Sequence, residues 1–123
     1  MAGRISLPRL QLGPTPVAFI LDTGADMTML HPGDAHRLGI DFHSHFQGIQ
    51  QVEIPGVGTA HAYLERAILE LPHLNGSVDR LAGNIFIAVP TNTNRKHPSL
   101  LGRDVFDHYS IIYSKAKNIL VLQ

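Results

Sequence analysis

The alternation of apolar and polar side chains divides this chain into short strands. Residues 4–12 alternate around Pro8, as an edge strand does. Residues 17–22 form an apolar run that ends in an acid, and its β-branched and aromatic content favours a buried strand over a helix. The same reasoning predicts further strands at residues 45–54, 59–72, 85–89, 111–113 and 119–122. Strands predominate, so the pattern predicts a mainly β class.

Glycine and proline mark the breaks between these strands. Two prolines within residues 13–16 predict a turn. Pro-Gly-Val-Gly at residues 55–58 joins two strand-like runs into an expected β-hairpin, and Asn75 with Gly76 marks a second hairpin turn. Residues 91–98 are polar and form an expected loop.

Two short helices are expected among these strands. The first covers residues 31–39, because Pro32 suits the first helical position and Gly39 suits the residue just past the end. The second covers residues 103–109, after Gly102. Asp104 would then lie near the positive end of the helix dipole, which is an ordinary structural place for an acid.

Composition excludes several classes of partner and cofactor. The 123 residues suit one domain, which we expect to span residues 1–123. The 10 basic and 10 acidic side chains cancel, which argues against a nucleic-acid surface, and the absence of cysteine excludes thiolate metal sites. No apolar run approaches the roughly 20 residues that cross a bilayer, so no membrane partner is expected. Residues 1–13 lack the apolar segment of a secretory signal, and we expect a cytoplasmic location.

The acid that ends the strand at residues 17–22 is the strongest chemical signal in the chain. Asp22 begins the sequence Asp-Thr-Gly-Ala-Asp, and burying an unpaired carboxylate is costly. Asp before Gly is also common in ordinary tight turns, so the tripeptide alone is weak evidence. The apolar residues on both sides, and the sequence Leu-Leu-Gly-Arg-Asp at residues 100–104, make a catalytic interpretation the better one.

Together these motifs resemble the retropepsin-like aspartic proteases, from about Ile5 to Leu122. Within the family, Met-Thr-Met-Leu at residues 27–30 and Gly-Arg-Asp-Val-Phe at residues 102–106 are most similar to the protease domains of eukaryotic DNA-damage-inducible proteins and of soluble bacterial relatives. The resemblance implies a retropepsin-like closed β-barrel, the acid protease fold, in a single domain that forms a two-fold homodimer. It implies no cofactor and no metal.

The implied chemistry needs two carboxylates, and the chain has one Asp-Thr-Gly motif. Two aspartates at about 3 Å cannot both ionise, so they share a proton: the charged one activates water and the protonated one donates to the scissile carbonyl. Asp104 and Asp107 lack the Thr-Gly continuation. The site would therefore lie on the two-fold axis of a homodimer, with Asp22 from each copy acting on a peptide or protein substrate.

The resemblance also assigns roles around Asp22. Thr23 would reach across the dimer axis, Gly24 would let the substrate backbone approach, Asp26 would pair with Arg103, and Gly102 would pack behind the loop. Residues 47–63 would form a flap that closes over substrate, with its tip at either residues 50–52 or residues 55–58. The expected substrate-binding residues are Ala25, Asp26, Leu30, Ile54, Val57 and Gly58.

Two other interpretations stay open. The chain could be a catalytically weak or inactive module that keeps the fold, dimerises and binds peptides. The 8 histidines could hold a metal, but no pair has the helical spacing with an acidic partner that metalloprotease helices have, so surface histidines are the simpler interpretation. The clustered ones are His31, His36, His43 and His45.

Overall fold

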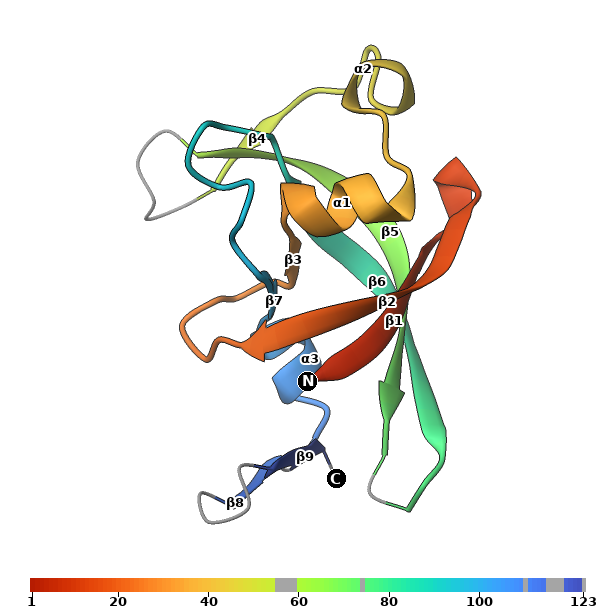
Figure 1. Ribbon diagram of the computed structural model, residues 1–123, viewed down its shortest axis with the longest axis vertical. Helices are drawn as coiled ribbons and strands as arrows, with labels where there is room; N and C mark the ends of the chain where they lie inside the picture. Colours follow the sequence, from red (N-terminus) through yellow and green to blue (C-terminus); the bar gives the residue numbers. More distant parts are fainter. Residues whose placement is uncertain (55–59, 74, 110, 115–118, 123) are drawn as a thin grey trace.

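The computed structural model describes residues 1–54, 60–73, 75–109, 111–114 and 119–122, and its main body is a closed β-barrel (Figure 1). Six strands follow one another around the barrel in the order β1-β2-β7-β3-β6-β5, and β5 pairs with β1 to close it. This confirms the expected mainly β, closed-barrel class. The barrel strands are β1 (Ala2–Leu7), β2 (Leu12–Leu21), β3 (Met29–Leu30), β5 (His61–Pro72), β6 (Val78–Ala88) and β7 (Ser99–Leu101).

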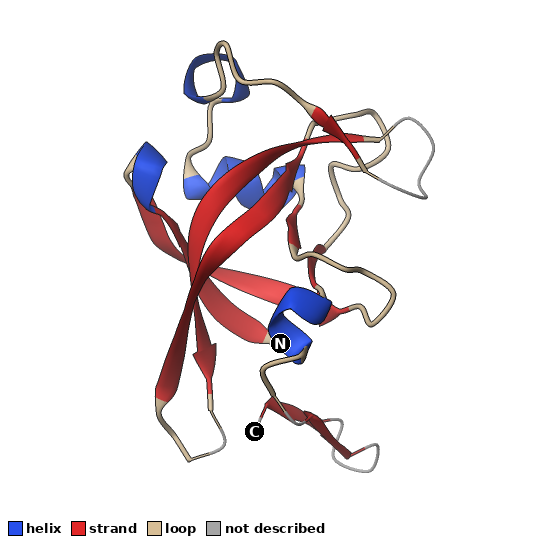
Figure 2. Cartoon of the chain, turned by 180° about the vertical axis from the view of Figure 1, so that it is seen from behind, coloured by secondary structure: helices blue, strands red, loops and turns tan. Residues whose placement is uncertain are grey.

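The β5–β6 hairpin is the longest element of the barrel and runs along its whole height (Figure 2). Its register extends from Ala62 opposite Ala88 to Pro72 opposite Val78. The turn contains the predicted Asn75 and Gly76, and Gly76 adopts a φ of 85°, which an L side chain rarely tolerates. The second hairpin turn is therefore confirmed.

The first barrel strands differ from the prediction at both prolines. The strand expected at residues 4–12 ends at Leu7, because Pro8 begins a 3₁₀ turn (η1, Pro8–Leu10), where a residue without an N–H is tolerated. It is also not an edge strand, since β1 pairs with both β2 and β5. The turn expected at residues 13–16 is wrong as well: these residues lie within β2. Proline is accommodated because β2 pairs there with β1 alone, and β7 joins only at residues 19–21.

Helix α1 (Pro32–Leu38) has the predicted limits, with Pro32 at its start and Gly39 just past its end at a φ of 100°. Helix α2 (Phe42–His45) was not predicted; the carboxylate of Asp41 caps it by accepting the N–H groups of His43 and Ser44. The strand expected at residues 45–54 is therefore wrong, except for β4 (Val52–Glu53). Helix α3 (Arg103–Phe106) is shorter than the expected 103–109. The described residues thus contain three short α-helices, where two were expected.

The C-terminal strands form a separate two-stranded sheet. Strand β8 (Ile111–Ser114) pairs antiparallel with β9 (Ile119–Leu122), which confirms the two strands predicted there. Among the described residues, neither strand pairs with the barrel, and Figure 1 shows the hairpin extending below α3.

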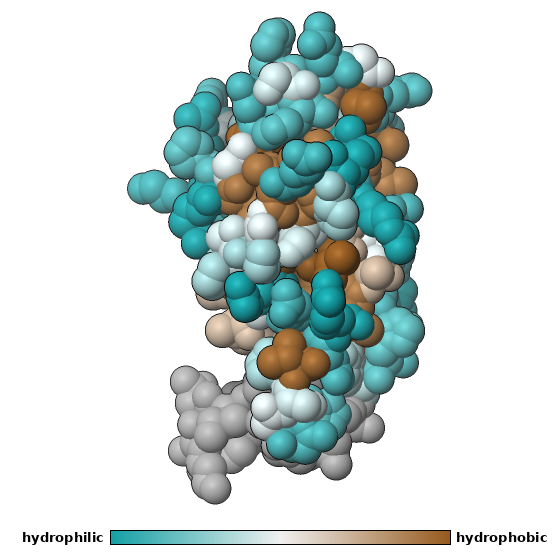
Figure 3. All heavy atoms as spheres, turned by 90° about the vertical axis from the view of Figure 1, so that its right-hand side faces the viewer, coloured by the Kyte–Doolittle hydropathy of each residue, from teal (hydrophilic) through white to brown (hydrophobic). Residues whose placement is uncertain are grey.

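The core lies inside the barrel and under α1. Its fully buried members include Ile5, Leu7, Leu30, Ile87 and Leu101, which come from four different strands. On the face seen in Figure 3, hydrophilic side chains cover most of the surface and the apolar ones lie in separate groups between them. No helix among the described residues is long and apolar enough to cross a membrane.

Candidate active site

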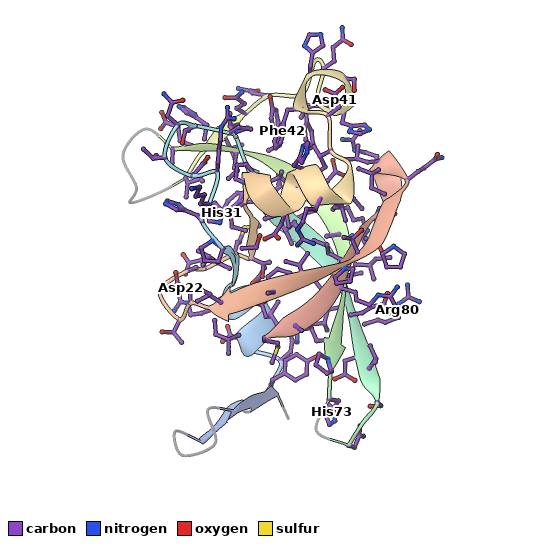
Figure 4. The ribbon with its side chains drawn as sticks, in the orientation of Figure 1. Asp22, His31, Asp41, Phe42, His73 and Arg80 are labelled. Carbon is purple, nitrogen blue, oxygen red and sulfur yellow. The ribbon has the colours of Figure 1, made fainter. Side chains whose placement is uncertain are left out.

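The strand order exposes the Asp-Thr-Gly loop at one end of the barrel. Strands β2 and β3 follow each other in the sequence but are not neighbours, because β7 lies between them, parallel to β2 and antiparallel to β3. The chain from Leu21 to Met29 must therefore cross the end of β7. We call residues 22–28 the catalytic loop, after the role that the sequence predicts for Asp22, and Figure 4 shows Asp22 at its outward edge.

The backbone fixes the direction of the Asp22 carboxylate. The Asp22 N–H donates to Leu101 O at 3.0 Å, and the Ala25 N–H donates to Asp22 O at 3.1 Å, which closes a tight turn. One carboxylate oxygen, Oδ1, accepts the Gly24 N–H at 2.9 Å. The other oxygen makes no hydrogen bond within the described part of the chain, and Asp22 is half-buried. The second oxygen is thus free of hydrogen bonds from the described part of this chain.

Gly24 lies close to the Asp22 carboxylate. A Cβ at residue 24 would lie 3.2 Å from Asp22 Oδ1, closer than most real Cβ contacts, so the carboxylate would have to shift by a few tenths of an ångström. The neighbouring Thr23 is exposed on the same turn. The predicted catalytic residues therefore lie together at the surface, with Asp22 held by its own loop.

Gly102 braces the catalytic loop from behind, as the resemblance implies. A Cβ at residue 102 would lie 2.6 Å from the Met27 carbonyl carbon and 2.9 Å from Ala25 O, distances that no side chain tolerates. The next two residues continue the contact: the Arg103 N–H donates to Ala25 O at 2.8 Å and the Asp104 N–H to Asp26 O at 3.1 Å. Close backbone packing therefore fixes the loop on the start of α3.

The guanidinium of Arg103 forms an ion pair with Asp26, the pairing that the resemblance implies. Asp26 raises the pKa of Arg103 through this hydrogen bond. Both side chains are largely exposed, at 78% for Asp26 and 56% for Arg103, so the pair adds little to folding stability. Its effect is to hold the loop on α3 near Asp22.

Thr28 and Asp104 form a second brace, which sequence reasoning missed. Thr28 is fully buried; its N–H donates to Asp104 Oδ2 and its hydroxyl donates to Asp104 Oδ1, both at 2.9 Å. The same hydroxyl accepts the Gly102 N–H at 3.2 Å. The available signal was a hydroxyl residue inside the apolar Met-Thr-Met-Leu run, which needs a polar partner once it is buried.

We predict that Thr28→Val destabilises the protein by about 2 kcal/mol, because it leaves an Asp104 oxygen and the Gly102 N–H without their shared partner while keeping the side chain's shape. Urea unfolding measures the loss, and Thr28→Ser, which keeps the hydroxyl, is the matched control. Equal stability of the Val and Ser variants would show that this brace does not hold the loop.

The expected substrate-binding residues fall into three groups. Ala25 and Asp26 lie on the catalytic loop. Ile54 lies at the end of the β4 arm, where its N–H donates to Ala60 O at 3.0 Å, and Val57 and Gly58 lie outside the described residues. Val52 is paired with Ala62, so residues 50–52 are not the tip of this hairpin, and the other predicted tip, residues 55–58, lies outside the described residues.

Leu30 does not belong with these residues. It is fully buried in the core, because the pairing of β3 with β6 turns its side chain inward, so the expectation that Leu30 lines a subsite is wrong. A cavity of about 300 Å³ lies between the β5–β6 hairpin and the α3 region and is lined by none of the expected substrate-binding residues.

The clustered histidines differ in how exposed they are. His36 and His43 are exposed as expected, but His31 is buried, so its interpretation as a surface histidine is wrong. Its Nδ1 lies 2.7 Å from Pro98 O and its ring packs edge-on against His97. Burial lowers the pKa of His31. Within the described ranges no group of three or more His, Asp or Glu side chains is placed to share a metal ion.

Comparisons with known proteins agree with this geometry. A family model described as aspartyl protease matches residues 9–105. A retropepsin-like aspartic protease from Rickettsia conorii superposes with a TM-score of 0.62 at 19% identity, covering 99% of this chain and 79% of that one. EIAV protease complexed with the inhibitor HBY-793 superposes with a TM-score of 0.55 at 20% identity, covering 88% of this chain and 84% of that one. A search of curated proteins found no match.

Proposed function

Because the chain belongs to the aspartyl protease family, we propose that it is an endopeptidase that works as a homodimer with Asp22 of each copy in one shared site. The observation that carries this proposal is the single Asp-Thr-Gly turn, whose outward-facing carboxylate is held by its own backbone and braced by Gly102. One chain supplies one such carboxylate, whereas the aspartic protease mechanism uses two that share a proton. We propose that residues 1–123 form the single domain that dimerises in this way.

The chemistry follows from the shared proton. When two Asp22 carboxylates face each other across a two-fold axis, like-charge repulsion keeps one protonated. The ionised group takes a proton from a bound water, and the protonated group donates to the carbonyl oxygen of the scissile bond. No metal and no covalent intermediate is needed. The hydrogen bond from the Gly24 N–H to Oδ1 supports this role because it fixes where the carboxylate points.

We propose that the substrate binds as an extended strand across the dimer. Thr23 would link the two catalytic loops, Gly24 and Ala25 would pass close to the substrate backbone, and Asp26 would accept its hydrogen bonds. The β4–β5 hairpin would act as the flap, with Ile54, Val57 and Gly58 over the substrate. Apolar residues at these positions favour hydrophobic side chains beside the cut.

A peptide-library digest with the purified protein tests this proposal. We expect cleavage between hydrophobic residues that a statine-type inhibitor blocks, because such transition-state analogues bind aspartic dyads more tightly than substrate does. We also expect activity per chain to rise with protein concentration, since only the dimer is complete. Binding of peptides without cleavage would instead support the inactive peptide-binding module. The shared site would be contradicted if the protein sediments as a strict monomer and still cleaves peptides with an activity per chain that does not depend on its concentration.

A further inference from the structure

Residues 90–98, which we call the basic loop, are fixed between the proposed flap and the catalytic loop. At its first end, the Val89 N–H donates to His61 O at 3.0 Å, where the β5 arm of the flap hairpin begins. The Asn94 side chain donates back to Val89 O at 2.9 Å and closes the loop on itself. Its other end continues directly into β7. The last residue of β7, Leu101, accepts the hydrogen bond from the Asp22 N–H.

A polar network holds the second half of this loop against α1. The His31 N–H donates to Ser99 Oγ at 2.9 Å, and the fully buried Ser99 donates to Asp34 Oδ2 at 2.6 Å. The loop backbone also approaches α1 closely, since a Cβ at Gly33 would lie 2.9 Å from Arg95 O. The position of the basic loop is therefore set at both ends and in its middle.

Three consecutive basic residues, Arg95, Lys96 and His97, lie on this loop and are exposed. Among the described residues, none of their side chains makes an ion pair or a hydrogen bond. The acid behind them, Asp34, is already engaged by Ser99 and by Arg37 at 2.5 Å. On the flap side the β4 strand offers one exposed acid, Glu53. The loop therefore presents an excess of positive charge at the margin of the groove that the catalytic loop and the proposed flap would form around the substrate.

In Figures 1 and 4 the basic loop, the flap hairpin and Asp22 all lie on one side of the barrel, opposite Arg80. We propose that this loop selects substrates with acidic side chains a few residues from the scissile bond. The inference rests on the proposed peptidase function, and it adds the chemical class of the substrate. By the two-fold symmetry of the homodimer, one basic loop would border each end of the groove, so acids on both sides of the hydrophobic cut are favoured.

Matched peptide pools test this preference. Each pool has a randomised hydrophobic central pair, and the flanking positions carry Glu, Gln or Lys. For the wild-type protein we expect kcat/KM to be about fivefold higher for the Glu pool than for the Gln pool at low salt, with the advantage shrinking as salt rises. The variant Arg95→Ala/Lys96→Ala is expected to lose this advantage. Arg66→Ala/Arg80→Ala, which removes two exposed charges from the β5–β6 hairpin, is expected to keep it.

A binding measurement separates this inference from the peptidase proposal. The Asp22→Asn protein is titrated with fluorescein-labelled pools, because this measurement follows binding and requires no cleavage. Tighter binding of the Glu pool, lost in the Arg95→Ala/Lys96→Ala background, supports acidic selection even if the wild type cleaves nothing. Cleavage without any difference between the Glu and Gln pools overturns acidic selection and leaves the peptidase intact. If the protein neither cleaves nor binds the pools, both the acidic selection and the peptidase proposal are overturned.

Discussion

Replacing Asp22 with Asn is expected to lower kcat/KM for peptide cleavage by about a thousandfold or more, because the amide can neither accept a proton from water nor share one with a second carboxylate. The substitution keeps the shape of the side chain and an oxygen that can accept the Gly24 N–H. The fold is therefore expected to survive, and the urea midpoint should stay near that of the wild type. The measurement is steady-state hydrolysis of the best peptide from the library digest.

Asp107→Asn is the matched control, since Asp107 is exposed just after α3 and has no part in the catalytic loop. It is expected to keep full activity. If Asp22→Asn and Asp107→Asn cleave equally well, Asp22 is not the catalytic acid and the proposed function fails.

Mixing subunits tests whether the site is shared. When the wild type and Asp22→Asn are combined in equal amounts and allowed to exchange, half of the dimers contain one carboxylate. Activity per wild-type chain should then fall to about half, because only dimers with two carboxylates are active. Unchanged activity per wild-type chain would mean that each copy works alone.

Local sequence chemistry predicted the parts of the fold that local interactions determine. The Asn75-Gly76 turn and the limits of α1 were predicted correctly, because a φ above zero and the ends of a helix depend on the residue itself. The turn at residues 13–16 was wrong, because the effect of a proline in a strand depends on whether a neighbouring strand needs its N–H. Helix α2 was missed although its Asp41 cap is a local signal, and the packing beside it is not local: the Phe46 ring, directly after the helix, stacks on Tyr63 with centroids 4.2 Å apart.

In the candidate site, too, the sequence predicted local features but not long-range contacts. The motif around Asp22 was recognised from the sequence, and the ion pair of Arg103 with Asp26 was implied by the resemblance. The brace between Thr28 and Asp104 joins residues 76 positions apart, and no local pattern carries such a contact. Leu30 was misplaced because the direction of its side chain is set by the neighbouring strands of β3 and not by its own hydrophobicity.

An ion pair whose carboxylate is buried ties the η1 turn to the barrel. The carboxylate of Glu65 on β5 is 2% exposed and accepts hydrogen bonds from Arg9 Nε at 3.0 and 3.1 Å. The Arg9 terminal nitrogen approaches the same group at 2.5 Å, and this contact raises the pKa of Arg9. Arg9 lies on η1, the turn that replaced the predicted continuous strand. The pair therefore fixes where β1 ends and β2 begins.

Arg9→Met is expected to lower the free energy of unfolding by about 3 kcal/mol, because among the described residues it leaves the buried Glu65 carboxylate only the Arg66 N–H as a partner. The double variant Arg9→Met/Glu65→Met is expected to recover most of this loss, since replacing both members of a buried pair by apolar side chains is often neutral. Urea unfolding of the two single variants and the double variant gives the coupling between the side chains.

The surface pair of Arg37 with Asp34 provides the matched control for this cycle. The Arg37 side chain is 52% exposed, much as that of Arg9 is, but Asp34 keeps the Ser99 hydroxyl as a hydrogen-bond donor, so Arg37→Met is expected to cost less than about 1 kcal/mol. If Arg9→Met costs no more than Arg37→Met, water reaches Glu65 through the half-exposed arginine and the pair is not a buried one in solution. If Arg9→Met is costly and the double variant is equally unstable, the loss comes from the packing of the arginine stem on the barrel, not from the uncompensated charge of Glu65.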